Sequence, residues 1–388
     1  MKLRVSRRAA LAGVAALVAG VALGAPAPAQ EPIRIGFHVP LTGFAAGDGK
    51  SAQLGAELAV EQINAEGGVL ARPLELVTYD DQAAAEQAVP LANKLLGEGV
   101  KAVISGSYSA PTRAAAGVFQ KEGIPYISAY AIHPDITRAG DYVFRTSFMG
   151  EVQGRAGAKL VGEILDKQRV VLITLNNDFG QSLAEGFKQA AEQFGIEIVN
   201  EYSYGIQDRQ FGSIVASVKR DQPDAIYASG YFFTAGPLVS QLRAGGIEAP
   251  IIGQEGYDTQ QFIDIAKSAA EGVIITTSLD RDTDDEAMRA FIEQFEEKAG
   301  FPADMVAATT NTAVHVMADA IERAGEVDPQ KIRDALSATN DLPTATGHIT
   351  FNELGEIQKI VQAQVVKDGA YRHYAVIDDP ELLAPPSQ

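Results

Sequence analysis

The 388-residue sequence contains no cysteine, no tryptophan and only five histidines. Without cysteine the chain can form no disulfide, no thiolate metal site and no thiol nucleophile. None of the histidines belongs to a paired or HExxH pattern that would indicate zinc; they are His38, His133, His315, His348 and His373. The glycine-rich stretch PLTGFAAGDG also lacks the G-x-G-x-x-G order of a dinucleotide site. The sequence therefore predicts neither a metal centre nor a cofactor.

Basic residues are scarce as well. The chain has 32 lysines and arginines against 50 aspartates and glutamates, which gives a net charge of −18. This excess of negative charge repels nucleic acid and anionic lipid surfaces. Apolar residues make up 46% of the chain, which is enough to build globular cores. We therefore expect a soluble globular protein whose partners include no nucleic acid and no membrane surface.

An apolar run follows the basic N-terminal stretch MKLRVSRR. This run, LAGVAALVAGVALG, is too short and too rich in alanine for a stable membrane span, and small residues at Ala27 and Ala29 fit a cleavage site. We predict that residues 1–29 are a signal peptide cleaved before Gln30, which leaves 359 residues with a net charge of −22 in the periplasm. Ser6–Leu11 resembles a twin-arginine signal but lacks two of its usual residues, so this route and ordinary Sec export both stay open.

Strand-like and helix-like segments alternate twice along the chain. The first run has strands at 33–37, 74–79, 101–105 and 125–128, with helices at 51–65 and 84–96 and a third helix after residue 108. The second run has strands at 169–174, 196–202, 225–228 and 250–253, with helices at 182–194, 211–220 and 235–244. Such alternation predicts parallel sheets covered on both faces. We therefore predict an α/β fold with two doubly wound parallel-sheet lobes.

The segments that follow these two runs contain too few predicted strands to form a third domain. They comprise predicted helices at 284–299, 304–324 and 329–338 and a hairpin-like tail at 348–377, which must pack on the two lobes. Open parallel sheets bind ligands at the carboxyl ends of their strands. The loops with the most informative residues follow predicted strands; they are 40–49, 105–111, 129–134, 175–180, 229–233 and 254–258. We expect these loops to line a cleft between the lobes.

The stretch ISGSYSAPTRAAAG at 104–117 places Ser107, Tyr108 and Ser109 between a strand and a helix. Three interpretations apply: a plain turn, a catalytic serine, or a binding site for a carboxylate. The stretch lacks the G-x-S-x-G pattern of a nucleophile elbow, so we expect no enzymatic activity. Ser109 occupies an N-cap position before Pro111, where free N–H groups and the helix dipole favour an anion. Capping of its own helix and contact with a ligand both stay open.

Several stretches together resemble a known family almost end to end. They are IRIGFHVPLTGFAAGDG, GAELAVEQINAEGGVLARPLELVTYDD, AVPLANKLLGEGVKAVISGSYS, EGIPYISAYAIHPDIT, DYVFRTSF, GQEGYD with AAEGVIITTS, and GHITFNELGE. They are similar to the periplasmic solute-binding proteins of the leucine/isoleucine/valine-binding type, which serve ABC importers. The resemblance implies a type I periplasmic-binding fold whose lobes are joined by three crossings, near 147–150, 276–278 and 347–348. One lobe would comprise 30–147 and 278–347, and the other 148–277 and 348–388.

The resemblance also implies ligand-binding positions in the first lobe. Ser109 matches a hydroxyl that binds the carboxylate of an amino acid, and Ser107 and Tyr108 belong to the same motif. Tyr130, Ala131 and Ile132 match positions that offer backbone groups to the ligand. The family's amino-acid binders usually have a threonine where Ile132 stands, and isoleucine has no hydroxyl. This departure puts a plain α-amino acid ligand in doubt.

The matched positions in the second lobe depart from the family pattern at one aromatic residue. Phe179 stands where the family usually has a tyrosine, and it either lines the cleft or packs within its lobe. Tyr231 belongs to an aromatic cluster at a strand end. Glu255 matches the acid that receives a ligand ammonium group, unless it is an ordinary exposed loop acid, and Tyr257 belongs to the same motif. Whether the neighbouring His133 and Phe232 line the cleft stays open, and Phe44 is expected to reach the cleft from the loop 40–49.

We therefore expect a monomeric periplasmic protein that captures a small molecule and delivers it to an ABC permease in the inner membrane. The expected ligand is an amino acid or a related small carboxylate or amide with an apolar or aromatic body. The alternative is a periplasmic sensor of the same fold that signals to a regulator. The presence of an export signal without a membrane anchor favours delivery.

Overall fold

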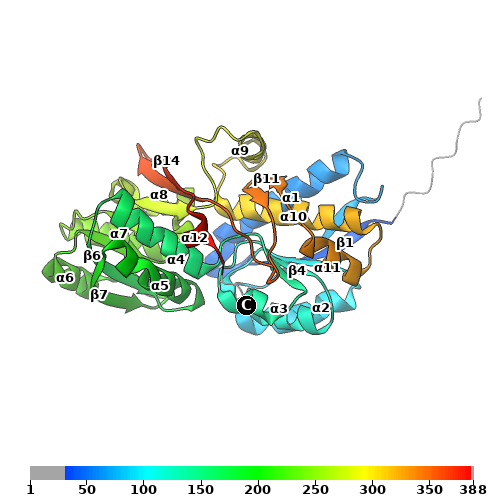
Figure 1. Cartoon of the computed structure of the whole chain (residues 1–388), viewed down its shortest axis with the longest axis horizontal. Coiled ribbons are helices and arrows are strands. Elements are labelled where there is room, and N and C mark those ends of the chain that lie inside the picture. Colours follow the sequence, from blue (N-terminus) through cyan, green and yellow to red (C-terminus); the bar gives the residue numbers. More distant parts are fainter. Residues whose placement is uncertain (1–30, 386–388) are drawn as a thin grey trace, which may run out of the picture. The chain divides into compact units, whose positions relative to one another are not determined.

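The computed structural model describes residues 31–385, so the predicted signal peptide at 1–29 lies outside the described residues. Two α/β lobes, each built on its own main sheet, are seen in Figure 1. Within residues 31–385, no helix combines the length and the apolarity needed to span a lipid bilayer. The predicted fold class, with two lobes built on parallel sheets, is confirmed.

The first lobe contains a five-stranded parallel sheet with the order β2-β1-β3-β4-β5. Its strands are β1 (Ile33–Val39), β2 (Leu74–Asp80), β3 (Val103–Ser105), β4 (Tyr126–Ser128) and β5 (Val143–Arg145). Six of the seven residues of β1 are buried, as expected for a parallel strand that helices cover on both faces. This burial places the lobe's core along both faces of the sheet.

The second lobe contains a seven-stranded sheet with the order β14-β13-β10-β9-β8-β6-β7. Its strands are β6 (Arg169–Leu175), β7 (Glu197–Tyr204), β8 (Ala225–Ala228), β9 (Ile251–Gly253), β10 (Ile274–Thr277), β13 (Val361–Lys367) and β14 (Ala370–Ile377). Strands β6 to β10 are parallel, and the antiparallel hairpin β13–β14 extends the sheet beside β10. The predicted hairpin-like tail is therefore confirmed as the edge of this sheet. A further small hairpin pairs β11 (Leu342–Thr344) with β12 (Gly347–Ile349).

Helices cover both sheets. They are α1 (Ala46–Ala65), α2 (Ala85–Gly97), α3 (Ser109–Lys121), α4 (Gly150–Lys159), α5 (Asp178–Ala191), α6 (Gly212–Asp221), α7 (Phe232–Ala244), α8 (Gln260–Ala266), α9 (Glu286–Ala299), α10 (Met305–Ala324), α11 (Pro329–Ser337) and α12 (Pro380–Leu383). Helix α10 packs against α1 although the two lie far apart in sequence. Gly55 permits this close packing, since a Cβ there would lie 2.3 Å from the carbonyl oxygen of Ala307. The segment after β10 thus adds α9, α10 and α11 to the first lobe.

Most predicted elements are present, with shifted ends. Helix α5 begins four residues earlier than predicted, because the Asn177 side chain accepts a hydrogen bond from the N–H of Gly180 at 2.9 Å and caps the helix. Helix α7 begins at Phe232 instead of 235. Strands β5 and β10 and helices α4 and α8 were not predicted from the residue pattern. The two strands have only three and four residues, all of them buried, so they show no alternation of apolar and polar residues.

The chain passes between the lobes after β5, after β10 and before β13. The third passage lies further along the chain than the resemblance placed it. The backbone N–H of Arg145 in β5 donates to the carbonyl of Gly355, so the chain is still attached to the first lobe at that point. Strand β13 of the second lobe begins at Val361. The crossing therefore falls within 356–360 instead of 347–348.

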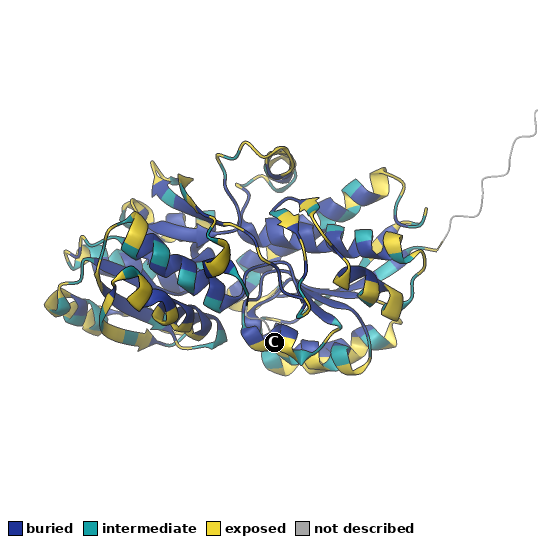
Figure 2. Cartoon of the chain, in the orientation of Figure 1, coloured by how far each residue is buried: buried dark blue, intermediate teal, exposed yellow. Residues whose placement is uncertain are grey.

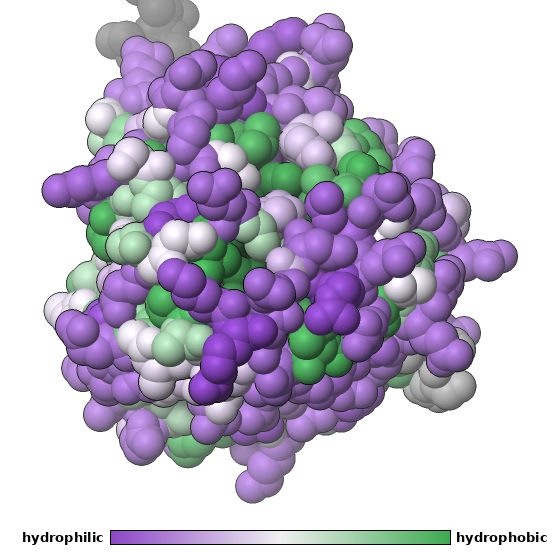
Figure 3. Space-filling view, turned by 90° about the vertical axis from the view of Figure 1, so that its left-hand side faces the viewer, coloured by the Kyte–Doolittle hydropathy of each residue, from purple (hydrophilic) through white to green (hydrophobic). Residues whose placement is uncertain are grey.

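Buried residues concentrate in the sheets and on the inward faces of the helices, whereas exposed residues cover the outer helix faces (Figure 2). The end of the second lobe shown in Figure 3 is mainly hydrophilic, with apolar residues in small recessed patches. Most buried apolar residues of the two lobes belong to one continuous cluster, and a second, smaller cluster lies in the first lobe around α2 and α3. Polar residues are also buried at the carboxyl ends of several strands, among them Ser105, Ser128 and Ser229. These strand ends form the candidate site.

Candidate functional site

A small cavity lies where loops of the two lobes meet. Its lining from the first lobe consists of Asp48, Tyr108, Ser109, Tyr130, Ala131, Met305 and Val306. Its lining from the second lobe consists of Phe179, Tyr231, Glu255 and Gly256. The position at the carboxyl ends of parallel strands is typical of ligand sites in α/β folds.

Aromatic rings from the two lobes are in direct contact at this cavity. Tyr108 of the first lobe stacks on Tyr231 of the second, with ring centroids 4.1 Å apart and an angle of 2° between the rings. Phe179 also stacks on Tyr231, with ring centroids 4.8 Å apart. An ion pair between Arg113 and Asp178, at 3.0 Å, also joins the lobes. The structure therefore represents a closed arrangement.

Ser109 is the first residue of α3 and lines the cavity with only 2% of its surface exposed. The N-cap is Tyr108, and no side chain caps the helix, so the interpretation of Ser109 as the cap of α3 is wrong. The Ser109 hydroxyl accepts a hydrogen bond from the N–H of Ile132 at 3.3 Å instead. Its own proton therefore stays available to a ligand, beside the unpaired N–H groups of the first helical turn.

Glu255 lies in the turn after β9 and is 4% exposed, so it is not the exposed loop acid that the sequence left open. Neither carboxylate oxygen has a hydrogen-bond partner among residues 31–385. Burial raises the pKa of Glu255 to about 8, against the lowering effects of Lys359 and Arg145. An unpartnered buried carboxylate is unfavourable, so this site is built to accept a cation or a hydrogen-bond donor.

Lys359 is the basic residue with the largest effect on the Glu255 carboxylate. It belongs to the third crossing, where its ammonium donates to the carbonyl of Thr146 at 3.4 Å and lies over the ring of Phe148. Burial lowers the pKa of Lys359 to about 7, while Glu255 opposes this shift. The two groups lie near each other at the hinge, so the charge state of each affects the other.

Asp48 was not predicted as a site residue, although the loop that precedes it was. It lies in the first turn of α1, it is 6% exposed, and Oδ2 accepts a hydrogen bond from the Tyr108 hydroxyl at 2.6 Å. Burial raises its pKa to about 7, and the hydrogen bond from Tyr108 opposes this shift. The available signal was an acid between Gly47 and Gly49, in the glycine-rich stretch that follows β1.

Met305 and Val306 were also missed, and they enter the cavity as the first residues of α10. No local pattern connects this helix to the strand ends of the first lobe. Gly256 completes the lining. A larger residue would not fit there, since an added Cβ would lie 2.1 Å from the carbonyl oxygen of Gly230.

Several predicted residues lie outside the lining. Phe44 is 39% exposed and packs over Tyr108 and Phe233, so it covers the cavity from outside. Ile132 and Ser107 are buried and do not belong to the lining, and the Ile132 N–H donates to the Ser109 hydroxyl. Tyr257 is buried in the second lobe, where its ring packs on Phe262. The sequence left open whether His133 and Phe232 line the cleft, and neither of them belongs to the lining of the cavity. The structure therefore brings together Tyr108, Ser109, Tyr130, Ala131, Phe179, Tyr231 and Glu255.

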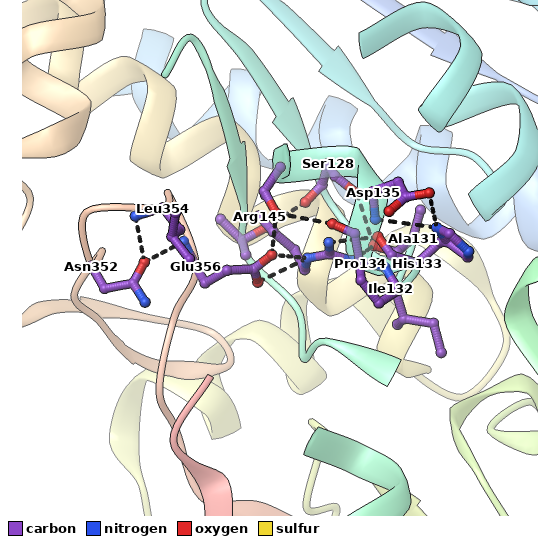
Figure 4. Close-up of polar contacts among 12 residues, drawn as sticks. Ser128, Ala131, Ile132, His133, Pro134, Asp135, Arg145, Asn352, Leu354 and Glu356 are labelled. Carbon is purple, nitrogen blue, oxygen red and sulfur yellow. Dashed lines mark hydrogen bonds and ion pairs between the residues drawn. The ribbon is translucent and has the colours of Figure 1, made fainter. Parts of the chain in front are cut away.

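A buried ion pair holds the loop after β4 in place (Figure 4). The Arg145 Nε donates to both Glu356 oxygens, at 3.1 and 3.0 Å, and both side chains are almost fully buried. The other guanidinium nitrogens donate to the carbonyls of Ala131 at 2.6 Å and His133 at 2.8 Å. Thr137 also donates to Glu356. Arg145 thus connects β5, the loop that lines the cavity and the third crossing.

Replacing Ser109 by alanine is expected to weaken binding of the best ligand by more than tenfold. The change removes a hydroxyl donor from a buried site, and hydrogen bonds to charged groups contribute about 1.5–3 kcal/mol. Isothermal titration calorimetry measures the effect. Ser107→Ala is the matched control, since this hydroxyl is buried two residues away and lies outside the lining. Equal affinities of Ser109→Ala and the unmodified protein would remove Ser109 from the site.

Comparisons with known proteins agree with this architecture. The sequence model of the family described as "Periplasmic binding protein" matches residues 32–370. The leucine-, isoleucine-, valine-, threonine- and alanine-binding protein of Pseudomonas aeruginosa is 32% identical over 85% of this chain and 88% of its own length. The Leu/Ile/Val-binding protein of Escherichia coli strain K12 is 29% identical over 84% of this chain and 89% of its own length.

Solved structures show the same fold. A branched-chain amino acid transporter substrate-binding protein from Streptococcus pneumoniae, in complex with isoleucine, superposes with a TM-score of 0.84 at 28% identity, covering 90% of this chain and 99% of that chain. A solute-binding protein from R. palustris, in complex with benzoate, has the same fold with a TM-score of 0.82 at 23% identity, covering 90% of this chain and 98% of that chain. The fold predicted from the resemblance is therefore confirmed. The chain belongs to the periplasmic binding protein family, in the group similar to the Leu/Ile/Val-binding proteins.

Proposed function

We propose that this protein is the periplasmic substrate-binding component of an ABC importer and that it captures an amino acid or a related small carboxylate or amide. The observation that carries the proposal is the distribution of polar groups in the cavity. Ser109 of the first lobe can donate to a carboxylate, and Glu255 of the second lobe can accept from an ammonium or amide. A ligand with both groups meets its full set of partners only when the lobes are closed.

The proposed mechanism is a shift between open and closed forms. A ligand can move this equilibrium only by its difference in affinity for the two forms. The carboxylate would bind the Ser109 hydroxyl and the N-terminus of α3, while the cation would bind Glu255. The ligand body would lie against the rings of Phe179 and Tyr231. Micromolar affinity requires a net of about −8 kcal/mol, which charge-assisted hydrogen bonds and apolar burial together can supply.

The proposal includes delivery of the unchanged ligand to a permease in the inner membrane by a monomeric carrier. The lining supports binding over catalysis, because the residues that face the cavity in the described chain include no histidine to activate Ser109. The names of the relatives and the isoleucine complex support an amino acid as the ligand. The predicted signal peptide supports the periplasmic location.

A thermal-shift screen of amino acids, aromatic carboxylates and small amides tests the proposal. We expect at least one of these compounds to raise the melting temperature, since a ligand at 100 times its Kd adds about 2.7 kcal/mol of stability. We also expect leucine and valine to give smaller shifts than aromatic or extended carboxylates. The reason is the absence of side-chain hydroxyls at Ile132 and Phe179.

Two outcomes would contradict these expectations. The lack of any shift across all three compound classes would refute the proposed function. Dominance of leucine and valine over every other compound would refute the expected ligand preference alone. Calorimetric titration of the best compound and mass spectrometry of the material that co-purifies would then identify the ligand directly.

A further inference from the structure

Two acids line the cavity, one on each lobe, and they face no basic side chain in the described lining. Glu255 comes from the second lobe and Asp48 from the first, and both are more than nine-tenths buried. The proposed function uses one of these acids, because an α-amino acid has one ammonium group for Glu255. Asp48 is left without a partner from such a ligand.

The Asp48 carboxylate has a defined orientation. The Tyr108 hydroxyl donates to Oδ2 at 2.6 Å, and Tyr108 is itself held by its stacking on Tyr231 across the cleft. A single neutral donor compensates a buried carboxylate incompletely, and burial accordingly raises its pKa. Asp304 and Asp258 are near enough to add further negative potential. This end of the cavity therefore favours a positive or hydrogen-donating group.

These surroundings discriminate among small ligands. The aliphatic side chain of leucine or valine would bury Asp48 without supplying a hydrogen bond, which is costly for a carboxylate. Any ligand without a second N–H or O–H group would likewise leave Asp48 without a hydrogen-bond donor. A ligand with a second N–H or O–H group would satisfy Asp48 while its α-ammonium binds Glu255.

We propose that Asp48 is a specificity-determining residue. It binds a second hydrogen-bond donor, located at the end of the ligand's side chain. The ligand class is thus an amino acid whose side chain ends in an ammonium, amide or hydroxyl group. This inference rests on the proposed function, because it assumes that Ser109 and Glu255 bind the α-carboxylate and α-ammonium groups. The inference adds a preference among amino-acid side chains, which the binding of the α-carboxylate and α-ammonium groups alone does not create.

Matched ligand pairs of nearly equal shape test the proposal. The pairs are valine with threonine, leucine with asparagine, norleucine with lysine, and phenylalanine with tyrosine, each titrated by calorimetry into the unmodified protein. We expect the donor-bearing member to bind at least tenfold more tightly in at least one pair. The lysine pair reports a cationic partner for Asp48, and the other three pairs report a neutral one.

Variants then assign the preference to one residue. Asp48→Asn is expected to reduce the discrimination within the best pair by at least tenfold, and Asp48→Leu to reverse it. Glu61→Gln is the matched control, because it removes one negative charge from the same helix at an exposed side chain that forms an ion pair with Lys298. We expect Glu61→Gln to leave the discrimination unchanged.

The outcomes separate this inference from the proposed function. If no member of any pair binds, the inference fails, whereas the proposed function fails only if the aromatic carboxylates and small amides of the thermal-shift screen do not bind either. If ligands bind but the donor-free member is equal or tighter in every pair, only the inference is refuted. The inference is likewise refuted if Asp48→Asn folds and retains the full discrimination. The comparison of pairs on the unmodified protein needs no variant, so it decides the proposal even where a variant fails to fold.

Discussion

Glu255→Gln is expected to weaken binding of the best amino-acid ligand by on the order of a hundredfold. Removing one partner of a buried charged pair typically costs about 2–5 kcal/mol, and each 1.36 kcal/mol corresponds to a factor of ten. Glutamine keeps the shape of the side chain and can still accept one hydrogen bond, so the loss reports the charge. Calorimetric titration of both proteins with the same ligand at pH 7.5 measures it.

The same variant is expected to stabilise the ligand-free protein at alkaline pH. The pKa of Glu255 is raised to about 8 in the folded protein, from an ordinary value of 4.5. The folded state therefore holds the proton more tightly than the unfolded state. This contribution to the free energy of unfolding is fully present below pH 4.5 and is lost as the pH rises through 8. Glutamine resembles the protonated acid and loses nothing over this interval.

Melting temperatures at pH 5 and pH 8.5 test this second expectation. We expect similar values for the two proteins at pH 5 and a value for Glu255→Gln that is higher by roughly 2 °C or more at pH 8.5. Glu255 also raises the pKa of Lys359, so the difference between the two proteins reports Glu255 together with its effect on Lys359. Glu185→Gln, an exposed acid of α5 in the same lobe, serves as the control. If Glu255→Gln binds the ligand more weakly but is not more stable at pH 8.5, Glu255 is exposed to solvent in the ligand-free protein.

Opposite effects on affinity and stability are characteristic of a residue kept for function. Glu255 is buried and accepts no hydrogen bond within the described part of the chain, so other interactions must offset its cost in the ligand-free closed form. Its acid group becomes favourable only when the ligand supplies a cation or donor. This difference between the two states is what allows a ligand to drive closure.

The sequence predicted the parts of the fold that repeat a local pattern. Strands such as β1 and β6 and helices such as α10 have enough apolar residues in the right spacing to be found. The ends of the predicted strands, together with the family resemblance, then predicted that Ser109 and Glu255 lie at one cleft, because parallel sheets bind ligands at the carboxyl ends of their strands. The expected meeting of these two residues is present in the structure, since both line the same cavity.

Residues that act through distant neighbours could not be predicted in this way. Asp48 is a charged residue in a glycine-rich stretch that the sequence predicts as a loop, whereas in the structure it lies in the first turn of α1, buried and bonded to Tyr108. Met305 reaches the cavity because α10 returns to the first lobe after the chain has built most of the second. The predicted position of Ser109 in its helix was wrong by one residue, a difference that changes its hydrogen-bond partner from a backbone N–H of its own helix to that of Ile132.

The pairing of Arg145 with Glu356 could not be predicted from the sequence either, since 211 positions separate the two residues. Both side chains are buried, Arg145 also donates to two carbonyls, and Glu356 also accepts a hydrogen bond from Thr137. Breaking a buried pair by removing one member leaves an uncompensated charge, which costs about 3–5 kcal/mol. We therefore expect Arg145→Met and Glu356→Gln each to lower the free energy of unfolding by this amount.

Urea denaturation of the two single variants and of the double variant measures the effect as a shift of the unfolding midpoint at constant m-value. The double variant is expected to be less destabilised than the sum of the single variants, because it leaves no unpaired charge. Arg138→Met is the control. Its pair with Asp135 is more than half exposed on the arginine side, so its loss should cost less than about 1 kcal/mol. Additive effects in the double variant would show that Arg145 and Glu356 stabilise the protein independently.

The ion pair is also expected to matter for the ligand, in a way that stability alone does not explain. Arg145 holds the carbonyls of Ala131 and His133, and Ala131 lines the cavity. Glu356→Gln leaves these two hydrogen bonds in place, whereas Arg145→Met removes them. At a temperature where both variants are fully folded, Arg145→Met should therefore lose at least tenfold more affinity than Glu356→Gln. Equal affinities of the two variants would confine the role of Arg145 to stability and separate it from the positioning of the ligand-binding loop.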